Sequence, residues 1–257
     1  MPPLLRSFRP VCSPGLVLLL VLILTACQPR VWQVASVQPG ADPAGAATPV
    51  TAAAPVDSAA EQFIRPFRRQ VITQMSEVVA SSDTAWLKPG KLGNNAPLTT
   101  WVARVLRIEA GRSHGSLPDF AALTNGSIRS GLPAGPVTVG HVFELMPFEN
   151  ELTVLSVPGP IVQQLFDYAA KYDNVAAVNA SWVKSPAGAA TDVRIAGRPL
   201  DLSRTYTLAI NDYLANGGDG MSFLRPLRPL HANRTIRQAI LDYLRREKTI
   251  RYTDLTR

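Results

Sequence analysis

The sequence Asn211-Asp212-Tyr213-Leu214-Ala215-Asn216-Gly217-Gly218-Asp219-Gly220 places three glycines and one aspartate in its last four positions. Glycine tolerates positive φ and lets backbone N–H groups approach a bound group, so this composition predicts a tight turn. The apolar, alternating residues 206–210 predict a strand that leads into the turn. Tyr213 and Asp219 bracket the turn, so a ring and a carboxylate could face one site, although an ordinary structural turn has the same composition.

Two other segments of the chain also have the composition of sequence motifs. One is Asn125-Gly126-Ser127-Ile128-Arg129-Ser130-Gly131-Leu132-Pro133-Ala134-Gly135, and the other is Leu145-Met146-Pro147-Phe148-Glu149-Asn150. In order and spacing, these segments and the glycine turn resemble the C-terminal, substrate-recognising domain of the 5′-nucleotidase family, with its Gly-Gly-Ile-Arg and Leu-Pro-Phe-Gly-Asn motifs. The resemblance covers roughly residues 65–226 and implies a compact domain of mixed β-sheet covered by helices.

The resemblance also implies a ligand. In the family this domain holds the nucleoside of a nucleotide, and two rings at the positions of Phe148 and Tyr213 stack on the base. Stacking on a ring is worth about 1–3 kcal/mol per base and tolerates different bases. By the same match, Asp219 would accept hydrogen bonds from the ribose hydroxyls, and Arg129 would contact the sugar side through its planar donor fork. Core burial of the two rings and a surface salt bridge of Arg129 are the alternatives.

The match is looser around Gly126, whose counterpart approaches the ligand through its backbone. The family has an asparagine two places earlier; an ungapped match puts Thr124 there, with Asn125 one place later. Ser127 replaces the next family glycine and is expected to crowd the turn. In the preceding helix, Arg104 stands where the family has an aspartate.

The first residues predict export rather than fold. Arg6 and Arg9 form a basic segment, residues 17–24 form an apolar run too short to span a membrane, and Leu24-Thr25-Ala26-Cys27 is typical of a lipobox. We therefore expect residues 1–26 to be a lipoprotein signal peptide and Cys27 to carry lipid, which anchors the protein to the membrane at the bacterial cell envelope. Gln28 favours the outer membrane.

Residues 27–60 are rich in Ala and Pro and show no periodicity, which predicts a tether, and residues 61–257 are left for one domain. The two cysteines of the chain are Cys12 and Cys27, so no thiol is expected in the domain. The net charge of +7 falls to +5 without Arg6 and Arg9. This modest excess does not predict nucleic-acid binding, and the basic cluster Arg245, Arg246 and Lys248 is expected to be the solvated end of a helix.

Helices and strands interleave along residues 61–257, which predicts an α+β fold with a mixed sheet. Strands are expected over residues 119–124, 151–157, 192–196 and 205–210, and helices over residues 98–109, over residues 161–168 and, after a threonine cap, over 235–246. A helical stripe of apolar residues after Pro66 is expected to pack on the core; it consists of Phe67, Val71, Ile72, Met75, Val78 and Val79.

No catalytic or metal-binding residue is predicted in this chain. A 5′-nucleotidase cleaves phosphate with two divalent metal ions that activate water and clamp the phosphoryl oxygens. The resemblance places their ligands in a separate N-terminal domain. His114, His141 and His231 have no ligand spacing and are expected on the surface or in loops, and no nucleophile-elbow motif occurs.

Three hypotheses follow from these observations. The chain is the nucleoside-recognising half of a split 5′-nucleotidase, whose partner is an exported metallophosphoesterase chain. Alternatively, it is a non-catalytic module that binds nucleotides or nucleosides at the envelope. A third possibility is a structural lipoprotein that has kept the fold and lost the ligand. The joint presence of Phe148, Tyr213, Asp219 and Arg129 argues against the third.

Overall fold

The computed structural model describes residue 51, residues 54–90 and residues 95–255. The predicted signal peptide and Cys27 lie outside these residues. Asp57–Arg257 forms one compact unit. Its first element, α2 (Ser58–Met75), begins at the cap residue Asp57, whose side chain accepts from the amides of Ala59 and Ala60. The last residues of the predicted tether therefore belong to this helix.

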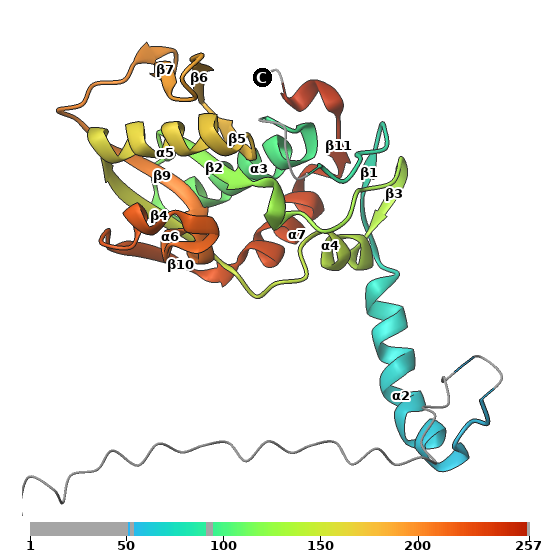
Figure 1. Cartoon of the computed structure of the whole chain (residues 1–257). Helices are drawn as coiled ribbons and strands as arrows, with labels where there is room; N and C mark the ends of the chain where they lie inside the picture. Colours follow the sequence, from blue (N-terminus) through green and yellow to red (C-terminus); the bar gives the residue numbers. More distant parts are fainter. Residues whose placement is uncertain (1–50, 52–53, 91–94, 256–257) are drawn as a thin grey trace, which may run out of the picture. The chain divides into compact units, whose positions relative to one another are not determined.

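A five-stranded sheet forms the centre of the unit (Figure 1). Strand β9 runs parallel to β2, and the other neighbours are antiparallel, so the sheet is mixed, as predicted. The strands lie in the order β10 (Pro229–Thr235), β4 (Glu151–Pro158), β9 (Thr205–Asn211), β2 (Phe120–Thr124) and β5 (Val175–Val178).

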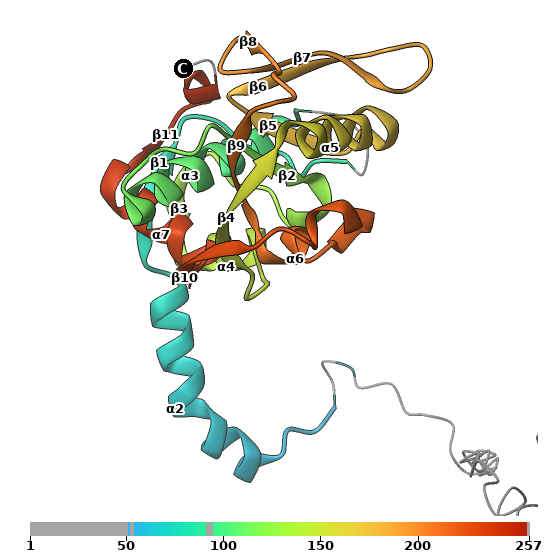
Figure 2. The same ribbon diagram turned by 90° about the vertical axis from the view of Figure 1, so that its left-hand side faces the viewer.

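Helices cover both faces of this sheet. Figures 1 and 2 show α3 (Pro97–His114) on one face and α5 (Gly159–Tyr172) on the other. All five residues of β2 are buried between them, and Phe120 of β2 lies with its ring centroid 5.8 Å from that of Phe166 in α5. Helix α7 (Ile236–Glu247) packs beside α3. The predicted α+β class is confirmed.

Two smaller sheets and several short elements complete the unit. One sheet has the order β11 (Thr249–Ile250), β1 (Val78–Ser82) and β3 (Gly135–Thr138), and the other β6 (Ala180–Lys184), β7 (Ala190–Ile195) and β8 (Arg198–Pro199). The short helices are α4 (Val139–Leu145) and α6 (Asp212–Ala215), and the 3-10 turns are η1 (Asn125–Ser127), η2 (Gly218–Gly220), η3 (Ser222–Leu224) and η4 (Tyr252–Leu255).

The predicted first helix is wrong in two respects. It ends at Met75, and Val78 and Val79 belong to β1, where Val78 pairs with Thr138 of β3. These β-branched residues continue the helical spacing by coincidence, but their packing suits a strand. Moreover, α2 buries none of its residues fully, and of the predicted stripe within this helix only Met75, at its last position, packs on the core, while Phe67, Val71 and Ile72 are exposed.

The other predicted elements are present with shifted ends. The predicted strands overlap β2, β4, β7 and β9. Helix α3 runs five residues beyond the predicted position 109 and stops where Gly115 adopts φ +75°, a conformation that suits glycine at a helix end. The predicted threonine cap of α7 is confirmed, because the Thr235 side chain accepts from the amide of Gln238.

Two predictions about basic side chains can be compared with the structure. Arg245, Arg246 and Lys248 are exposed at the end of α7, as predicted, but Arg246 also lies 2.7 Å from the carboxylate of Glu109, which is 1% exposed and is also bonded to Arg234. A buried carboxylate requires such partners. His141, predicted on the surface or in a loop, is partly exposed and lies in the first turn of α4, where its Nδ1 accepts from the amide of Thr138.

Candidate functional site

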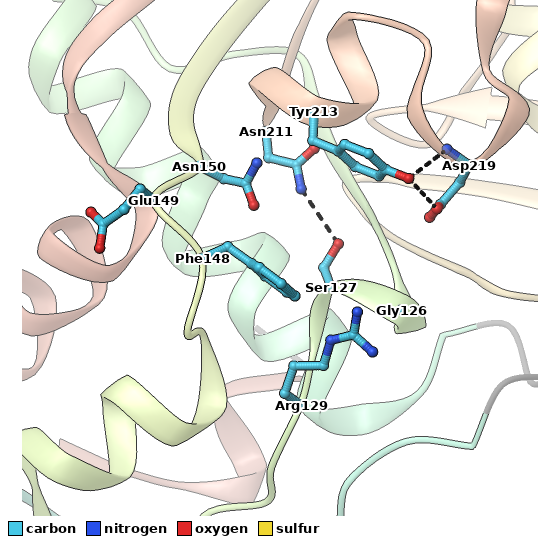
Figure 3. A pocket seen from close by; sticks show the side chains of 9 residues that line it. All are labelled: Gly126, Ser127, Arg129, Phe148, Glu149, Asn150, Asn211, Tyr213 and Asp219. Carbon is cyan, nitrogen blue, oxygen red and sulfur yellow. Dashed lines mark hydrogen bonds between the residues drawn. The ribbon is translucent and has the colours of Figure 1, made fainter. Parts of the chain in front are cut away.

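A cavity of about 370 Å³ opens where the ends of β4 and β9 meet η1 and η2 (Figure 3). Figure 3 shows the rings of Phe148 and Tyr213 pointing into the same space, with Asn211 and Ser127 between them. The lining residues come from three segments that are distant in sequence: Gly126, Ser127 and Arg129; Phe148, Glu149 and Asn150; and Asn211, Tyr213 and Asp219.

The chain leaves β9 through a short, capped helix that sets the position of Tyr213. Asn211 caps α6, since its Oδ1 accepts from the amide of Leu214 at 2.8 Å. The next residue, Asp212, uses Oδ1 to accept from the amide of Glu151 and from Asn150 Nδ2, both at 3.0 Å. These bonds tie the end of β9 to the start of β4. Sequence reasoning missed Asn150, Asn211 and Asp212, although an Asn before a helix is a recognisable cap.

Tyr213 and Asp219 form a closed hydrogen-bonded pair. The Tyr213 hydroxyl donates to Asp219 Oδ1 at 3.0 Å and accepts from the Asp219 amide at 3.2 Å. Asp219 has φ +52°, between glycines at φ +89° (Gly217) and +85° (Gly220). A Cβ on Gly218 would lie 2.5 Å from the Tyr213 ring. The glycines are therefore needed for the turn itself and for room beneath the ring.

Thr124 and Asn125 support the site from behind. The buried Thr124 hydroxyl donates to Asp219 Oδ2 at 2.7 Å, and the buried Asn125 Oδ1 accepts from Thr99 at 2.8 Å. Neither residue lines the cavity, so their direct contact with a ligand stays a prediction. Arg104, which replaces the family aspartate, is also outside the lining and donates to the carbonyl of Asp254.

The turn at Gly126 accommodates Ser127 without the expected crowding. Ser127 does not adopt positive φ, and its hydroxyl lies 3.3 Å from Thr124 Oγ1 and 3.4 Å from Asn211 Nδ2. A Cβ on Gly126 would lie 3.7 Å from Asp219 Oδ2, so the glycine backbone is adjacent to that carboxylate. Gly126 thus leaves the approach to Asp219 open.

Phe148 and Tyr213 are not core residues. Their exposed fractions are 36% and 49%, although both are large aromatic side chains. The Arg129 guanidinium lies 4.9 Å from the centroid of the Phe148 ring, within the range of a cation–π contact. Among the residues that the structure describes, Arg129 has no ion-pair partner, which argues against the surface salt bridge.

Arg237 of α7 holds the segment that carries Phe148, and sequence reasoning missed it. Its side chain is buried, its Nη1 donates to the carbonyls of Met146 and Phe148 at 3.3 and 3.2 Å, and its Nη2 pairs with Glu149. Its guanidinium also lies 4.2 Å from the ring of Phe143. No sequence signal marks it, because an arginine on a helix is usually solvated.

Tyr168 of α5 supports the glycine turn from the other side. Its hydroxyl donates to the backbone carbonyl of Asp219 at 2.7 Å. Burial raises the pKa of the Tyr168 phenol, a shift opposed by its hydrogen bond with Asn174 and reinforced by the nearby Asp219. The hydroxyl is therefore a donor at neutral pH.

The part of the chain that the structure describes contains no group of three or more His, Cys, Asp or Glu side chains that could hold a metal ion. Within the same residues, no helix combines the length and the apolar character needed to span a membrane.

Residues 72–225 match the family described as the 5′-nucleotidase C-terminal domain, which is more than half of the chain. The chain belongs to this family. It is 31% identical over 173 residues to Protein UshA of Yersinia enterocolitica and 27% identical over 176 residues to a 5′-nucleotidase of Vibrio cholerae. Each match covers 64% of this chain and 30% of the relative, so the chain spans about a third of the length of these relatives.

Two solved structures share the fold of this chain. The 5′-nucleotidase precursor of Thermus thermophilus superposes with a TM-score of 0.64 at 24% identity, over 76% of this chain and 42% of that one. The NAD nucleotidase of Haemophilus influenzae gives 0.60 at 15% identity, over 76% and 40%. Together these likenesses confirm the predicted resemblance and the domain-level fold.

Proposed function

We propose that this chain is the nucleoside-recognising half of a split 5′-nucleotidase-type hydrolase. One observation carries the proposal: three distant segments bring two exposed rings, an arginine and a hydrogen-bonded aspartate to a single cavity. An exposed ring is costly in water, and a cavity with such rings and convergent polar groups suits a planar, polar ligand.

Each lining group has a defined task in this proposal. A nucleobase enters between Phe148 and Tyr213, and the ribose hydroxyls donate to Asp219, whose carboxylate keeps lone pairs beyond those used by Thr124 and Tyr213. Gly126 leaves room for the sugar beside that carboxylate. Arg129 remains available to the sugar side of the nucleotide.

Hydrolysis of the phosphate requires a second chain in this proposal. The relatives are about three times as long as the matched part of this chain, and the resemblance assigns the two-metal centre to the part not matched here. A separate metallophosphoesterase chain would supply the divalent metal ions, which activate water and neutralise the phosphoryl oxygens. We expect no hydrolysis by this chain alone.

The lipobox at Cys27 supports an envelope location for this function. In the proposal the chain is exported, anchored through lipid on Cys27, and placed at the outer membrane by Gln28. Metabolic labelling with a radioactive fatty acid, compared between the natural chain and Cys27→Ser, tests the anchor. Label that persists in the variant contradicts it.

Calorimetric titration of residues 57–257 with adenosine and AMP tests nucleoside recognition. Tyr213→Ala should weaken binding by one to two powers of ten, because it removes a stacking contact worth about 1–3 kcal/mol. Tyr252→Ala is the matched control: Tyr252 is 52% exposed and does not line the cavity.

Three results decide the proposal. Binding that Tyr213→Ala weakens and Tyr252→Ala leaves unchanged supports it. Equal affinity for the natural chain and Tyr213→Ala rejects the assigned site. If the folded unit, checked by circular dichroism, binds neither adenosine nor AMP, the chain is the structural lipoprotein of the third hypothesis or its site is completed by a partner.

A further inference from the structure

Helix α2 carries an apolar face that no part of the described chain covers. Residues three or four positions apart lie on the same side of a helix. In α2 this spacing places five apolar residues on one side: Ala60, Phe63, Ile64, Phe67 and Val71. Phe63 is 71% exposed, Phe67 58% and Val71 52%. The rings of the two phenylalanines lie 5.8 Å apart, so the face is continuous. Figures 1 and 2 show α2 extending away from the sheets.

The opposite face of α2 is polar and basic. It consists of Gln62, Arg65, Arg69 and Thr73, all of them exposed. Arg65 and Arg69 form no ion pair with any described residue, whereas Arg68, at the edge of the apolar face, pairs with Glu61. Three arginines against a single acidic residue leave the helix with a net positive charge.

This combination of features indicates what kind of surface the helix fits. In proteins most of a helix's stability comes from burial of its apolar face, so the uncovered apolar face of α2 indicates a surface that it docks on. Phenylalanines on one side and arginines on the other are typical of helices that lie in the plane of a membrane interface, with apolar side chains at the boundary of headgroups and acyl chains. No described helix of this chain, α2 included, is suited to crossing the membrane.

We propose that α2 docks on the surface of a bilayer that contains anionic lipid, with Phe63, Ile64, Phe67 and Val71 inserted. Cys27 stands 30 positions before the helix cap Asp57, a length of chain that spans at most about 100 Å. A lipid on Cys27 would therefore keep α2 within reach of the same membrane.

A lipid surface explains the arrangement better than a protein partner or a second copy of the chain. The helix follows directly on the segment that bears the proposed anchor, and Arg65 and Arg69, which pair with no described carboxylate, complement anionic headgroups. The inference does not depend on nucleoside recognition, since no α2 residue lines the cavity.

Site-specific fluorescence on the full lipidated chain, reconstituted in vesicles, tests the docking. Phe67→Cys on the apolar face and Gln62→Cys on the polar face each receive an environment-sensitive label, and the vesicles contain lipids with a quencher on the acyl chain. We expect several-fold stronger quenching at position 67 than at position 62. Equal, weak quenching at both positions would overturn the proposal. A blue-shifted but unquenched label at position 67 would also overturn it, because a protein surface would then cover the helix.

A charge comparison makes the test sharper. Vesicles of phosphatidylcholine are compared with vesicles that also contain phosphatidylglycerol. The ratio of docked to undocked α2, from the quenching at position 67, should rise with phosphatidylglycerol, and Arg65→Gln or Arg69→Gln should each reduce it about fivefold. Adenosine titrations on the same variants serve as the control and should give unchanged affinity. A docked fraction that does not respond to either change contradicts the role of anionic lipid.

Discussion

At the scale of single residues, Gly218 lies directly beneath the ring of Tyr213. A Cβ at this position would meet three ring carbons at 2.5–2.6 Å, a distance that no side chain tolerates. Gly218→Ala should therefore displace the ring and weaken adenosine binding by at least about tenfold, comparable to the loss of one stacking contact.

Gly188→Ala is a suitable control for Gly218→Ala, because Gly188 lies in the β6–β7 hairpin, where a Cβ would meet no atom within 4 Å. Its φ of +82° makes that substitution strained, so it can reduce stability without touching the cavity. Titration calorimetry with both variants separates the two effects. If Gly218→Ala binds adenosine as the natural chain does, the ring of Tyr213 takes no part in binding.

Tyr213 contributes a hydroxyl as well as a ring, and Tyr213→Phe separates the two. The ring remains, so most stacking energy should be retained, whereas both bonds between the hydroxyl and Asp219 are lost. We expect adenosine affinity to fall by less than tenfold. The free energy of unfolding should fall by about 1 kcal/mol in total, because water replaces both lost bonds at this half-exposed side chain. Titration and urea denaturation measure the two effects. Affinity as low as that of Tyr213→Ala would mean that the hydroxyl, not the ring, orients the site.

At the scale of elements, α7 controls the segment between α4 and β4. Arg237 binds two carbonyls and the Glu149 side chain of that segment, so it sets the direction of Phe148. Arg237→Lys keeps the charge but cannot satisfy all of these acceptors with one ammonium group. We expect adenosine affinity to fall about tenfold and the free energy of unfolding to fall by about 1–3 kcal/mol, since buried acceptors lose their donor.

Arg245→Lys is the matched control, because Arg245 lies on the same helix and pairs with the exposed Glu77 away from the cavity. It should change neither quantity measurably. Equal adenosine affinities for Arg237→Lys and Arg245→Lys would show that Arg237 only stabilises the fold.

The contrast between predicted and observed elements has a physical reason. Strands β2, β4 and β9 could be predicted because each is a short apolar run, and the cap of α7 because it is local. The end of the first helix could not, since Val78 fits the helical period and only its pairing with Thr138, far along the chain, makes it a strand residue. The exposure of α2 likewise depends on what the rest of the fold leaves uncovered.

At the scale of the whole molecule, the sheet order assembles the site. The rings, Arg129 and Asp219 were predicted from their motifs, and the parallel pairing of β2 with β9 brings their segments together. The supporting bonds could not be predicted: Thr124 meets Asp219 across 95 positions and Arg237 meets Met146 across 91. Such contacts follow from topology, which local patterns do not contain.

The stability of the whole unit should also depend on alkaline pH. Burial raises the pKa of Tyr168 and of Tyr243 above the ordinary value of 10.0, and for Tyr243 the neighbouring Glu247 adds to the shift. The folded chain therefore holds these phenol protons more tightly than the unfolded chain. Their contribution to stability is complete below about pH 10 and is lost as the pH rises through the pKa values of the folded chain.

Urea denaturation between pH 8 and pH 11 should thus give a falling free energy of unfolding above about pH 10. Tyr168→Phe should show a smaller fall than the natural chain over that range, because one of the two groups is gone. Parallel pH profiles for Tyr168→Phe and the natural chain would contradict this prediction. They would mean that the Tyr168 phenol has the same pKa in the folded and unfolded chains, despite its bond to the Asp219 carbonyl.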